Sequence, residues 1–385
     1  MRLAFWLSIF LLIYVYGGFS VLVIIVGRLR QRHVRKQEIT PTMSLIIAAY
    51  NEEESIAARI DNALKLDYPA EALQIIVASD GSDDSTNSIV AGYADSRVQL
   101  LELPRRGKIH ALNDAVKHAT GEILVFSDAN SMYDAQALRM LSRNFAEAQV
   151  GGVAGNTIYT KLSKSDSSSQ GEDLYWSYDK WLKEMESLTG SIISAHGAIY
   201  AIRRELYRPI SDSAVTDDFA ISTLVIEQGY RLVFESEARA YEPPLPAAER
   251  EFRRKVRLMT RGFRSVLLRK ALLNPFRYGF YSLELFTHKV LRRLVPCILF
   301  VLFVSSVALQ SSGMIYVAAA AGQMIFYLLA GFGYVLRGQK LGKLKFLYIP
   351  FFYCLANFAA FVAMIKVLQG HQIERWQPQR TVSSA

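Results

Sequence analysis

Long apolar runs place the strongest limit on how this chain can fold. The first run, 3–26, contains about two dozen residues without a charge, and about 20 apolar residues suffice to cross a bilayer. Three further runs lie near 294–309, 314–336 and 346–368. No small-x-small cleavage site follows the first run, which is also too long for a signal peptide. The sequence therefore predicts one amino-terminal and three carboxyl-terminal transmembrane helices around a mixed central region.

Loop charges predict the orientation of these helices, because lysine and arginine collect on the cytoplasmic side. The segment 28–36 is strongly basic, two arginines at 292–293 precede the second run, and the loop 337–345 is also basic. The loop 310–313 carries no charge. The pattern predicts both termini outside and the central region in the cytoplasm, although two arginines in the tail, 371–385, weigh against it. We expect a multi-pass protein of the cell membrane.

The net charge narrows the range of partners. Lys and Arg total 44 against 35 Asp and Glu, which gives a formal net charge of +9. Such an excess suits nucleic acid, anionic lipid or anionic small molecules. The basic residues cluster beside the apolar runs, so we expect membrane lipids and small anions as partners, and no nucleic acid. Both cysteines, Cys297 and Cys354, lie inside apolar runs, so the central region has no disulfide, as in a reducing compartment.

The central region alternates short apolar segments with helical patterns. The predicted strands are 43–48, 73–78, 98–103 and 123–126, and the predicted helices are 52–66, 84–94, 109–117 and 135–148. This alternation is typical of an open, mainly parallel α/β sheet. Ligands of such sheets bind outside the carboxyl ends of the strands, so those ends are the places to search for a site.

Polar residues suited to a phosphate and a metal follow each predicted strand. They are Tyr50, Asn51 and Glu52 after the first, Asp80 after the second, Gly107 and Lys108 after the third, and Asp128 and Asn130 after the fourth. One such turn is uninformative, because Asp, Ser and Gly also cap helices and form turns. Four in succession predict a site for a phosphate-bearing ligand and a cation. Neither a dinucleotide fingerprint nor a P-loop sequence is present.

Two adjacent carboxylates, Asp217 and Asp218, begin a further helical pattern. The helix dipole favours acidic residues in a first turn whatever the function. The alternative is that one carboxylate faces a cleft and removes a proton from an acceptor hydroxyl. The two residues alone leave both interpretations open.

In combination and order, these motifs resemble those of membrane-bound family 2 glycosyltransferases with the GT-A fold, such as the bacterial cellulose and hyaluronan synthases. The resemblance covers about 43–270. It implies an α/β GT-A open sheet, Mg²⁺ or Mn²⁺ as cofactor, and a nucleotide-sugar donor, with a UDP-sugar preferred. It also implies inverting transfer to a saccharide or lipid-linked acceptor in polysaccharide biosynthesis.

The resemblance assigns roles to single residues. The donor would be bound by Tyr50, Glu52, Asp80, Lys108 and Asp128. Beside the resemblance, Arg254 and Arg257 on the basic helix 250–270 are predicted to face the diphosphate while its other arginines meet lipid. The metal would be held by Asp128 and Asn130, and Asp218 would be the catalytic base. The segment 196–198 would form the floor of the acceptor pocket.

Two motifs depart from the family pattern. Asn130 replaces the second acid of D-x-D; its amide oxygen can ligate a cation but adds no charge, so we expect weaker metal binding. The family's Q-x-x-R-W becomes Arg-Lys-Val-Arg-Leu at 254–258, without the tryptophan that stacks on the acceptor in processive synthases. This change tilts the prediction away from processive synthesis. A literal Q-x-x-R-W at 372–376 follows the last span and is interpreted as a chance match.

The predicted domain order is a transmembrane helix 1–27, a cytoplasmic GT-A domain 40–270, an interfacial helix 271–293, three transmembrane helices 294–370 and a tail 371–385. The polar segment 163–170 is expected to form a loop. The basic amphipathic helix 250–270 is expected to lie on anionic lipid.

The alternative to an enzyme is a transporter or receptor whose cytoplasmic domain only senses nucleotide. The predicted spans carry almost no ionisable residues, whereas transport pathways through membranes usually contain them. Release of nucleotide from a nucleotide-sugar would separate the two, because a sensor only binds the ligand.

Overall fold

The computed structural model describes residues 1–160, 168–211, 215–243, 251–339 and 341–370. The chain divides into two compact units. We call the first the sheet unit; its described residues belong to Val23–Pro246 and Leu268–Ser282. We call the second the helical unit; its described residues belong to Met1–Leu22, Ala247–Leu267 and Leu283–Ile373.

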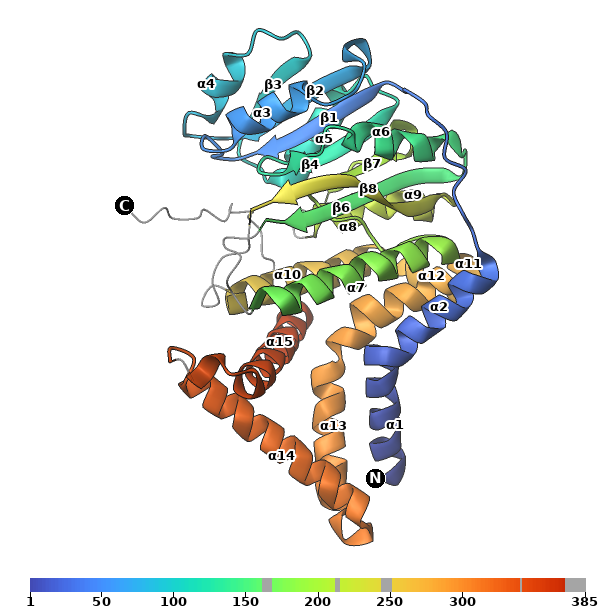
Figure 1. Ribbon diagram of the computed structural model, residues 1–385, viewed down its shortest axis with the longest axis vertical. Helices are drawn as coiled ribbons and strands as arrows, with labels where there is room; N and C mark the ends of the chain where they lie inside the picture. Colours follow the sequence, from blue (N-terminus) through green and yellow to red (C-terminus); the bar gives the residue numbers. More distant parts are fainter. Residues whose placement is uncertain (161–167, 212–214, 244–250, 340, 371–385) are drawn as a thin grey trace. The chain divides into compact units, whose positions relative to one another are not determined.

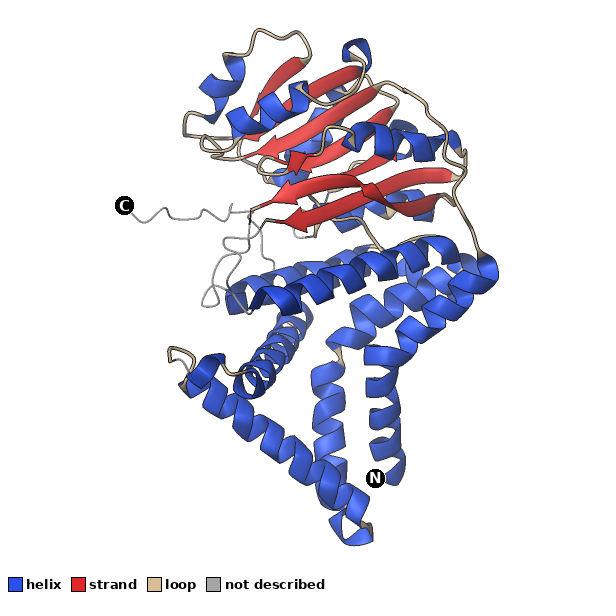
Figure 2. Cartoon of the chain, viewed as in Figure 1, coloured by secondary structure: helices blue, strands red, loops and turns tan. Residues whose placement is uncertain are grey.

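Within the described residues, the sheet unit is built on one mixed, eight-stranded sheet (Figures 1 and 2). Its order is β3-β2-β1-β4-β7-β6-β8-β5. The first four strands are parallel neighbours, whereas β7 runs antiparallel to both β4 and β6. The strands are β1 (Met43–Ala49), β2 (Leu73–Asp80), β3 (Val98–Leu103), β4 (Ile123–Asp128), β5 (Met132–Tyr133), β6 (Val150–Tyr159), β7 (Tyr200–Arg203) and β8 (Arg231–Glu242).

Every residue of β1 is buried, because helices cover both faces of the parallel half of the sheet. On one face, Leu45 and Ile47 pack with Ile56 and Ile60 of α3 (Ile56–Leu64) in a single hydrophobic cluster. On the other face, α5 (Lys108–His118) packs against β1 and β2. This double covering fixes the carboxyl ends of the strands relative to one another.

The predicted parallel strands are confirmed, and β2 and β4 continue two residues beyond their predicted ends. Three predicted helices are present but shorter: α3, α4 (Thr86–Ala91), and α6 (Ala137–Ser142) followed by a 3-10 turn (Arg143–Ala146). The predicted loop 163–170 is wrong at its end, because 168–170 belong to α7 (Ser168–Thr189); 163–167 lie outside the described residues.

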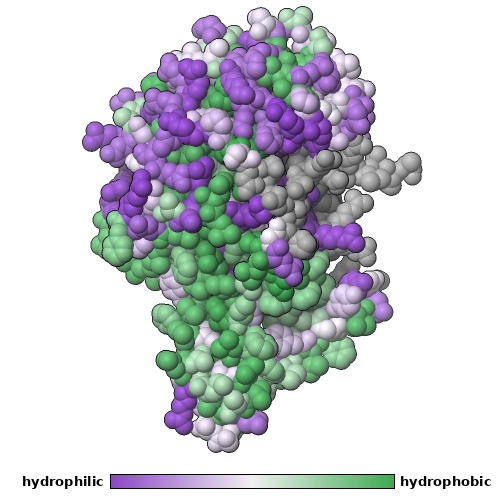
Figure 3. Space-filling model, turned by 180° about the vertical axis from the view of Figure 1, so that it is seen from behind, coloured by the Kyte–Doolittle hydropathy of each residue, from purple (hydrophilic) through white to green (hydrophobic). Residues whose placement is uncertain are grey.

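Three described helices are long and apolar enough to cross a membrane. They are Arg2–Arg30, which comprises α1 (Arg2–Ile13), a π-turn (Tyr14–Gly18) and α2 (Phe19–Arg30), then α14 (Met314–Val335) and α15 (Lys345–Leu368). The predicted second span is α13 (Val295–Ala308), which has 14 residues. It reaches span length only together with Phe280–Arg293, at a bend of 59°. Hydrophobic side chains gather over the helical unit (Figure 3).

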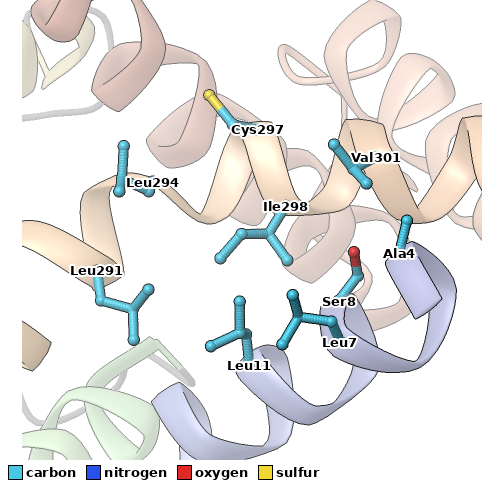
Figure 4. Close-up of a pocket in the computed structure, with 9 residues that line it drawn as sticks. All are labelled: Ala4, Leu7, Ser8, Leu11, Leu291, Leu294, Cys297, Ile298 and Val301. Carbon is cyan, nitrogen blue, oxygen red and sulfur yellow. The ribbon is translucent and has the colours of Figure 1, made fainter.

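The basic amphipathic helix predicted over 250–270 is α10 (Glu251–Leu268), whose residues up to Leu267 belong to the helical unit. The segment that follows is broken into α11 (Pro275–Tyr278), α12 (Phe280–Leu285), a π-turn (Phe286–Val290) and a 3-10 turn (Leu291–Arg293). An apolar pocket of about 340 Å³ lies between α1 and α13 (Figure 4). It is lined by Ala4, Leu7, Ser8, Leu11, Leu291, Leu294, Cys297, Ile298 and Val301.

Candidate active site

The sheet brings the donor residues predicted after its parallel strands to one edge. In the strand register, Ala48 of β1 pairs with Asp128 of β4, and Ala49 pairs with Ser79 of β2. Tyr50, Asp80 and Asp128 therefore leave neighbouring strands at the same end. The prediction that the strand ends meet is confirmed by this register.

Asp80 holds the loop that leads into α5. Its carboxylate is 2% exposed, accepts hydrogen bonds from the backbone N–H groups of Arg106 (2.8 Å) and Gly107 (2.9 Å), and pairs with the Arg105 guanidinium. Gly81 allows this close approach of the two loops, because a Cβ at position 81 would lie 2.8 Å from the backbone nitrogen of Arg105. Asp80 thus positions the residues just before Lys108, and its direct contact with the donor stays a prediction.

Tyr50 and Glu52 belong to a second loop that joins β1 to α3. The Arg105 guanidinium lies 3.3 Å from the centre of the Tyr50 ring, as in a cation–π pair. The Glu52 N–H donates to Thr86 Oγ1 at 2.8 Å, and the Glu52 carboxylate accepts from Ser55 Oγ at 2.8 Å. The loops after β1, β2 and β3 are therefore joined to one another by these side-chain contacts.

Lys108 joins two acidic motifs that lie far apart in the sequence, the turn at Asp128 and the pair at Asp217 and Asp218. Its Nζ lies 2.5 Å from Asp128 Oδ1 and 2.7 Å from Asp217 Oδ2, and the lysine is 9% exposed. Burial alone would lower the pKa of Lys108, but the carboxylates of Asp128 and Asp217 outweigh it and raise that pKa above its ordinary value. The ammonium is therefore charged at every physiological pH.

Asp217 and Asp218 begin α8 (Asp217–Ser222) and make different contacts. Whereas Asp217 pairs with Lys108, Asp218 Oδ1 accepts a hydrogen bond from the Phe219 N–H at 2.7 Å. Tyr200 is buried close to both. Burial raises the pKa of Tyr200, and the charges of Asp217 and Asp218 act in the same direction. Asp217 therefore contacts the donor turn through Lys108, and both acids lie near the buried Tyr200. Helix capping alone does not explain the two positions.

A buried arginine supports the turn after β4. Arg59 is 0% exposed; its Nη2 donates to Ser127 Oγ at 3.1 Å and its Nη1 to Asn62 Oδ1 at 3.1 Å. Ser127 Oγ in turn donates to the Asp128 carbonyl oxygen at 3.0 Å. Sequence reasoning missed Arg59, although one arginine on the apolar face of a predicted helix was a visible signal.

The predicted acceptor segment lies against Asp128. A Cβ on Gly197 would be 3.2 Å from Asp128 Oδ2, so glycine permits this approach. His196 contacts two residues of β6, with its Nδ1 3.2 Å from Thr157 Oγ1 and its Nε2 3.3 Å from Tyr159 Oη. The segment 196–198 therefore adjoins the donor residues.

Sequence reasoning also missed Glu242, the last residue of β8. Glu242 is 9% exposed, and its Oε1 accepts a hydrogen bond from Ser131 Oγ at 2.9 Å. Burial raises the pKa of Glu242, and the charge of Asp128 adds to this effect while His196 opposes it. A buried carboxyl thus lies beside the turn that contains Asp128 and Asn130.

The residues present fit a divalent cation that binds together with a diphosphate. Asp128 and Asn130 offer oxygen ligands, and the Lys108 ammonium already holds a positive charge against Asp128. Mg²⁺ is commonly bound through one or two carboxylates plus substrate phosphates. Among the described residues, no three His, Cys, Asp or Glu side chains are grouped to hold a metal alone. Arg254 and Arg257 lie on α10 in the helical unit, and their assignment to the donor stays a prediction.

The open mixed sheet, with acids and a buried lysine at its strand ends, defines a GT-A type of glycosyltransferase domain. Residues 44–210 match the sequence model described as "Glycosyl transferase family 2". The prediction of a family 2 glycosyltransferase is therefore confirmed.

Curated relatives support the same class. A poly-beta-1,6-N-acetyl-D-glucosamine synthase of Staphylococcus epidermidis is 28% identical over 203 residues, which cover 51% of this chain and 48% of that protein. The synthase of the same name from Staphylococcus aureus (strain COL) is 27% identical over 201 residues, covering 50% and 48%. The match thus spans about half the length of these relatives.

A solved structure shares the fold over nearly the whole chain. It is a mannosyltransferase from Pyrobaculum calidifontis in complex with GDP-Man and Mn²⁺. The TM-score is 0.70 at 22% identity, and the match covers 96% of this chain and 100% of that one. At this identity the likeness establishes the fold.

Proposed function

We propose that this protein transfers a sugar from a nucleotide-sugar, preferably a UDP-sugar, to a saccharide or lipid-linked acceptor at the cell membrane. The observation that carries the proposal is Lys108, whose buried ammonium lies between Asp128 of the donor turn and Asp217 beside the candidate base. This contact links the donor motif and the acid pair in one site.

The reaction would be a single displacement at the anomeric carbon. Asp218 takes the proton of an acceptor hydroxyl while that oxygen forms a bond to the anomeric carbon. The bond from that carbon to the diphosphate oxygen breaks, and the nucleoside diphosphate leaves with the electron pair. One displacement inverts the anomeric configuration, so the transferase is inverting.

The departing diphosphate needs positive charge. Lys108 supplies one such charge, because it is held at the strand ends by Asp128 and Asp217. A bound Mg²⁺ or Mn²⁺, held by Asp128 and Asn130, would neutralise further charge on the phosphate oxygens. Tyr50, beside Arg105, offers an aromatic face for the nucleotide base.

The wider setting is a membrane polysaccharide or glycolipid pathway step. The curated relatives are named as synthases of a polysaccharide of N-acetyl-D-glucosamine, which favours a saccharide acceptor. The apolar helices are long enough to hold the chain in a membrane. With the predicted topology, the sheet unit lies in the cytoplasm, where nucleotide-sugars are made.

The test is nucleotide release from defined donors. Membranes containing the full chain are offered UDP-sugars and GDP-sugars one at a time, and UDP or GDP is measured with and without a chelator. We expect release from at least one UDP-sugar and its loss when the divalent cation is removed. Binding of every donor without release from any would instead support the nucleotide-sensor alternative.

A further inference from the structure

Glu242 is a buried carboxyl that makes no ion-pair contact among the described residues, although Lys108 and His196 act on it from a greater distance. No described lysine or arginine lies within the 4.0 Å ion-pair distance of its oxygens, and its hydrogen bond comes from the neutral Ser131 hydroxyl. Burying a charged group is costly unless it is paired or coordinates a metal. A group of this kind therefore needs an explanation.

Strand pairing places Glu242 at the donor turn. Met132 of β5 pairs with Tyr241 of β8, so the next pair outward is Ser131 with Glu242. On its other side, Glu242 pairs with Tyr159 of β6, whose hydroxyl contacts His196. Glu242 is thus fixed next to the turn that begins at Asp128, where Ser131 N–H donates to the Asp128 carbonyl oxygen at 3.3 Å.

The turn after β4 carries one negative charge fewer than a D-x-D turn does. Asn130 stands at the second ligand position of the motif and contributes a neutral amide oxygen. Magnesium and manganese prefer oxygen ligands, and carboxylates above all. Glu242 of β8 brings a carboxylate to this turn through its hydrogen bond with Ser131.

We propose that Glu242 is a further ligand of the divalent cation and supplies the negative charge that Asn130 does not. The inference rests on the proposed function only in that the cation binds with a nucleoside diphosphate. Ser131 acts as a positioning residue, because its hydroxyl holds the Glu242 carboxylate against the turn. The ligand set therefore draws on two strands, β4 and β8.

The experiment measures Mn²⁺ binding to the full chain in nanodiscs with saturating UDP, followed by electron paramagnetic resonance of free Mn²⁺. Glu242→Gln removes the charge but keeps an oxygen that can accept from Ser131. Glu237→Gln is the control, because Glu237 lies on the same strand, is 59% exposed and pairs with Arg143. Thermal unfolding of each variant reports whether the fold persists.

We expect Glu242→Gln to weaken Mn²⁺ binding about 10–100-fold, the range seen for residues that support metal sites. Glu237→Gln should bind Mn²⁺ as the native chain does. The double variant Asn130→Asp with Glu242→Gln places a carboxylate at position 130 in place of the one at position 242, and it should restore Mn²⁺ binding.

Three results would overturn the inference: unchanged Mn²⁺ affinity in folded Glu242→Gln, no rescue by Asn130→Asp, or no Mn²⁺ binding to the native chain with either UDP or GDP. Failure of the proposed function gives a different result. In that case the native chain binds Mn²⁺ with UDP, and Glu242→Gln weakens this binding, but no nucleotide-sugar is turned over.

Discussion

Substitution of Lys108 tests the site directly, because its ammonium forms ion pairs with both Asp128 and Asp217. In Lys108→Met a side chain of similar length keeps the packing and loses the charge. Asp128 and Asp217, with side chains 31% and 16% exposed, then lose the ammonium that lies between them. We expect loss of stability and weaker binding of the nucleoside diphosphate.

The magnitude follows from burial. Removing one partner of a buried ion pair costs roughly 3–5 kcal/mol, and the partial exposure of Asp128 favours the lower end, about 3 kcal/mol. For a unit of this size, 1 kcal/mol shifts the melting temperature by about 2–4 °C. The sheet unit of Lys108→Met should therefore unfold roughly 6–12 °C below the native one.

The assay is thermal unfolding of the full chain in detergent, with Lys117→Met as the matched control. Lys117 lies on the same helix and pairs with Asp114 at 2.7 Å, but its side chain is 68% exposed. Exposed pairs contribute about 0–1 kcal/mol, so this variant should melt close to the native chain. Equal melting temperatures for Lys108→Met and Lys117→Met would show that Lys108 does not stabilise the site through its two carboxylates.

Tyr200→Phe should keep or raise stability by about 1 kcal/mol, because among the described residues the buried Tyr200 hydroxyl has no hydrogen-bond partner; a clear drop in melting temperature would contradict this. Burial alone would raise the pKa of Glu235, but hydrogen bonds from Arg143 and two other side chains lower it below the ordinary 4.5. Its stabilisation is present above that value and is lost as pH falls through the lowered pKa, so acid unfolding followed by fluorescence should be less steep in Glu235→Gln. Reporters fused at Ser312 and Gln339 should lie outside and inside, respectively, and the reverse would remove access to cytoplasmic donor.

The parallel half of the sheet was predictable because its strands are continuous apolar runs with turn residues at their ends. The strand β6 was not, since its glycines are poor strand formers. The structure shows why they are present: a Cβ on Gly152 would lie 2.8 Å from Leu232 Cδ1. In β6 close packing against β8 outweighs local propensity.

Helix α7 was hidden by the serine-rich segment before it. Its own signal was a pair of i,i+4 ion pairs, Asp179 with Lys183 and Lys180 with Glu184, of the kind that supports exposed helices. Composition located the apolar helix α13, but this helix reaches span length only together with the segment before the 59° bend. The bend depends on packing that the sequence does not display, and the second span stays a prediction.

At the site, the strand-end residues could be found by position, but their contacts could not. Lys108 and Asp217 lie far apart in sequence, and only the folded sheet brings them to 2.7 Å. Glu242 gave no local signal, because its partner Ser131 comes from the antiparallel pairing of β5 with β8. Sequence patterns identify residues of the right chemistry, whereas pairing between distant strands decides which of them meet.

The role of Asp218 as catalytic base is tested most directly by sugar transfer in Asp218→Asn, measured together with the affinity of this variant for UDP. If Asp218 is the base, transfer should fall about 10²–10⁴-fold, the usual contribution of a general base. UDP affinity and melting temperature should stay close to native, because Asp218 acts on the acceptor and its Phe219 hydrogen bond can be kept by the amide oxygen. Near-native transfer by the folded Asp218→Asn variant would contradict the assignment of Asp218 as the base.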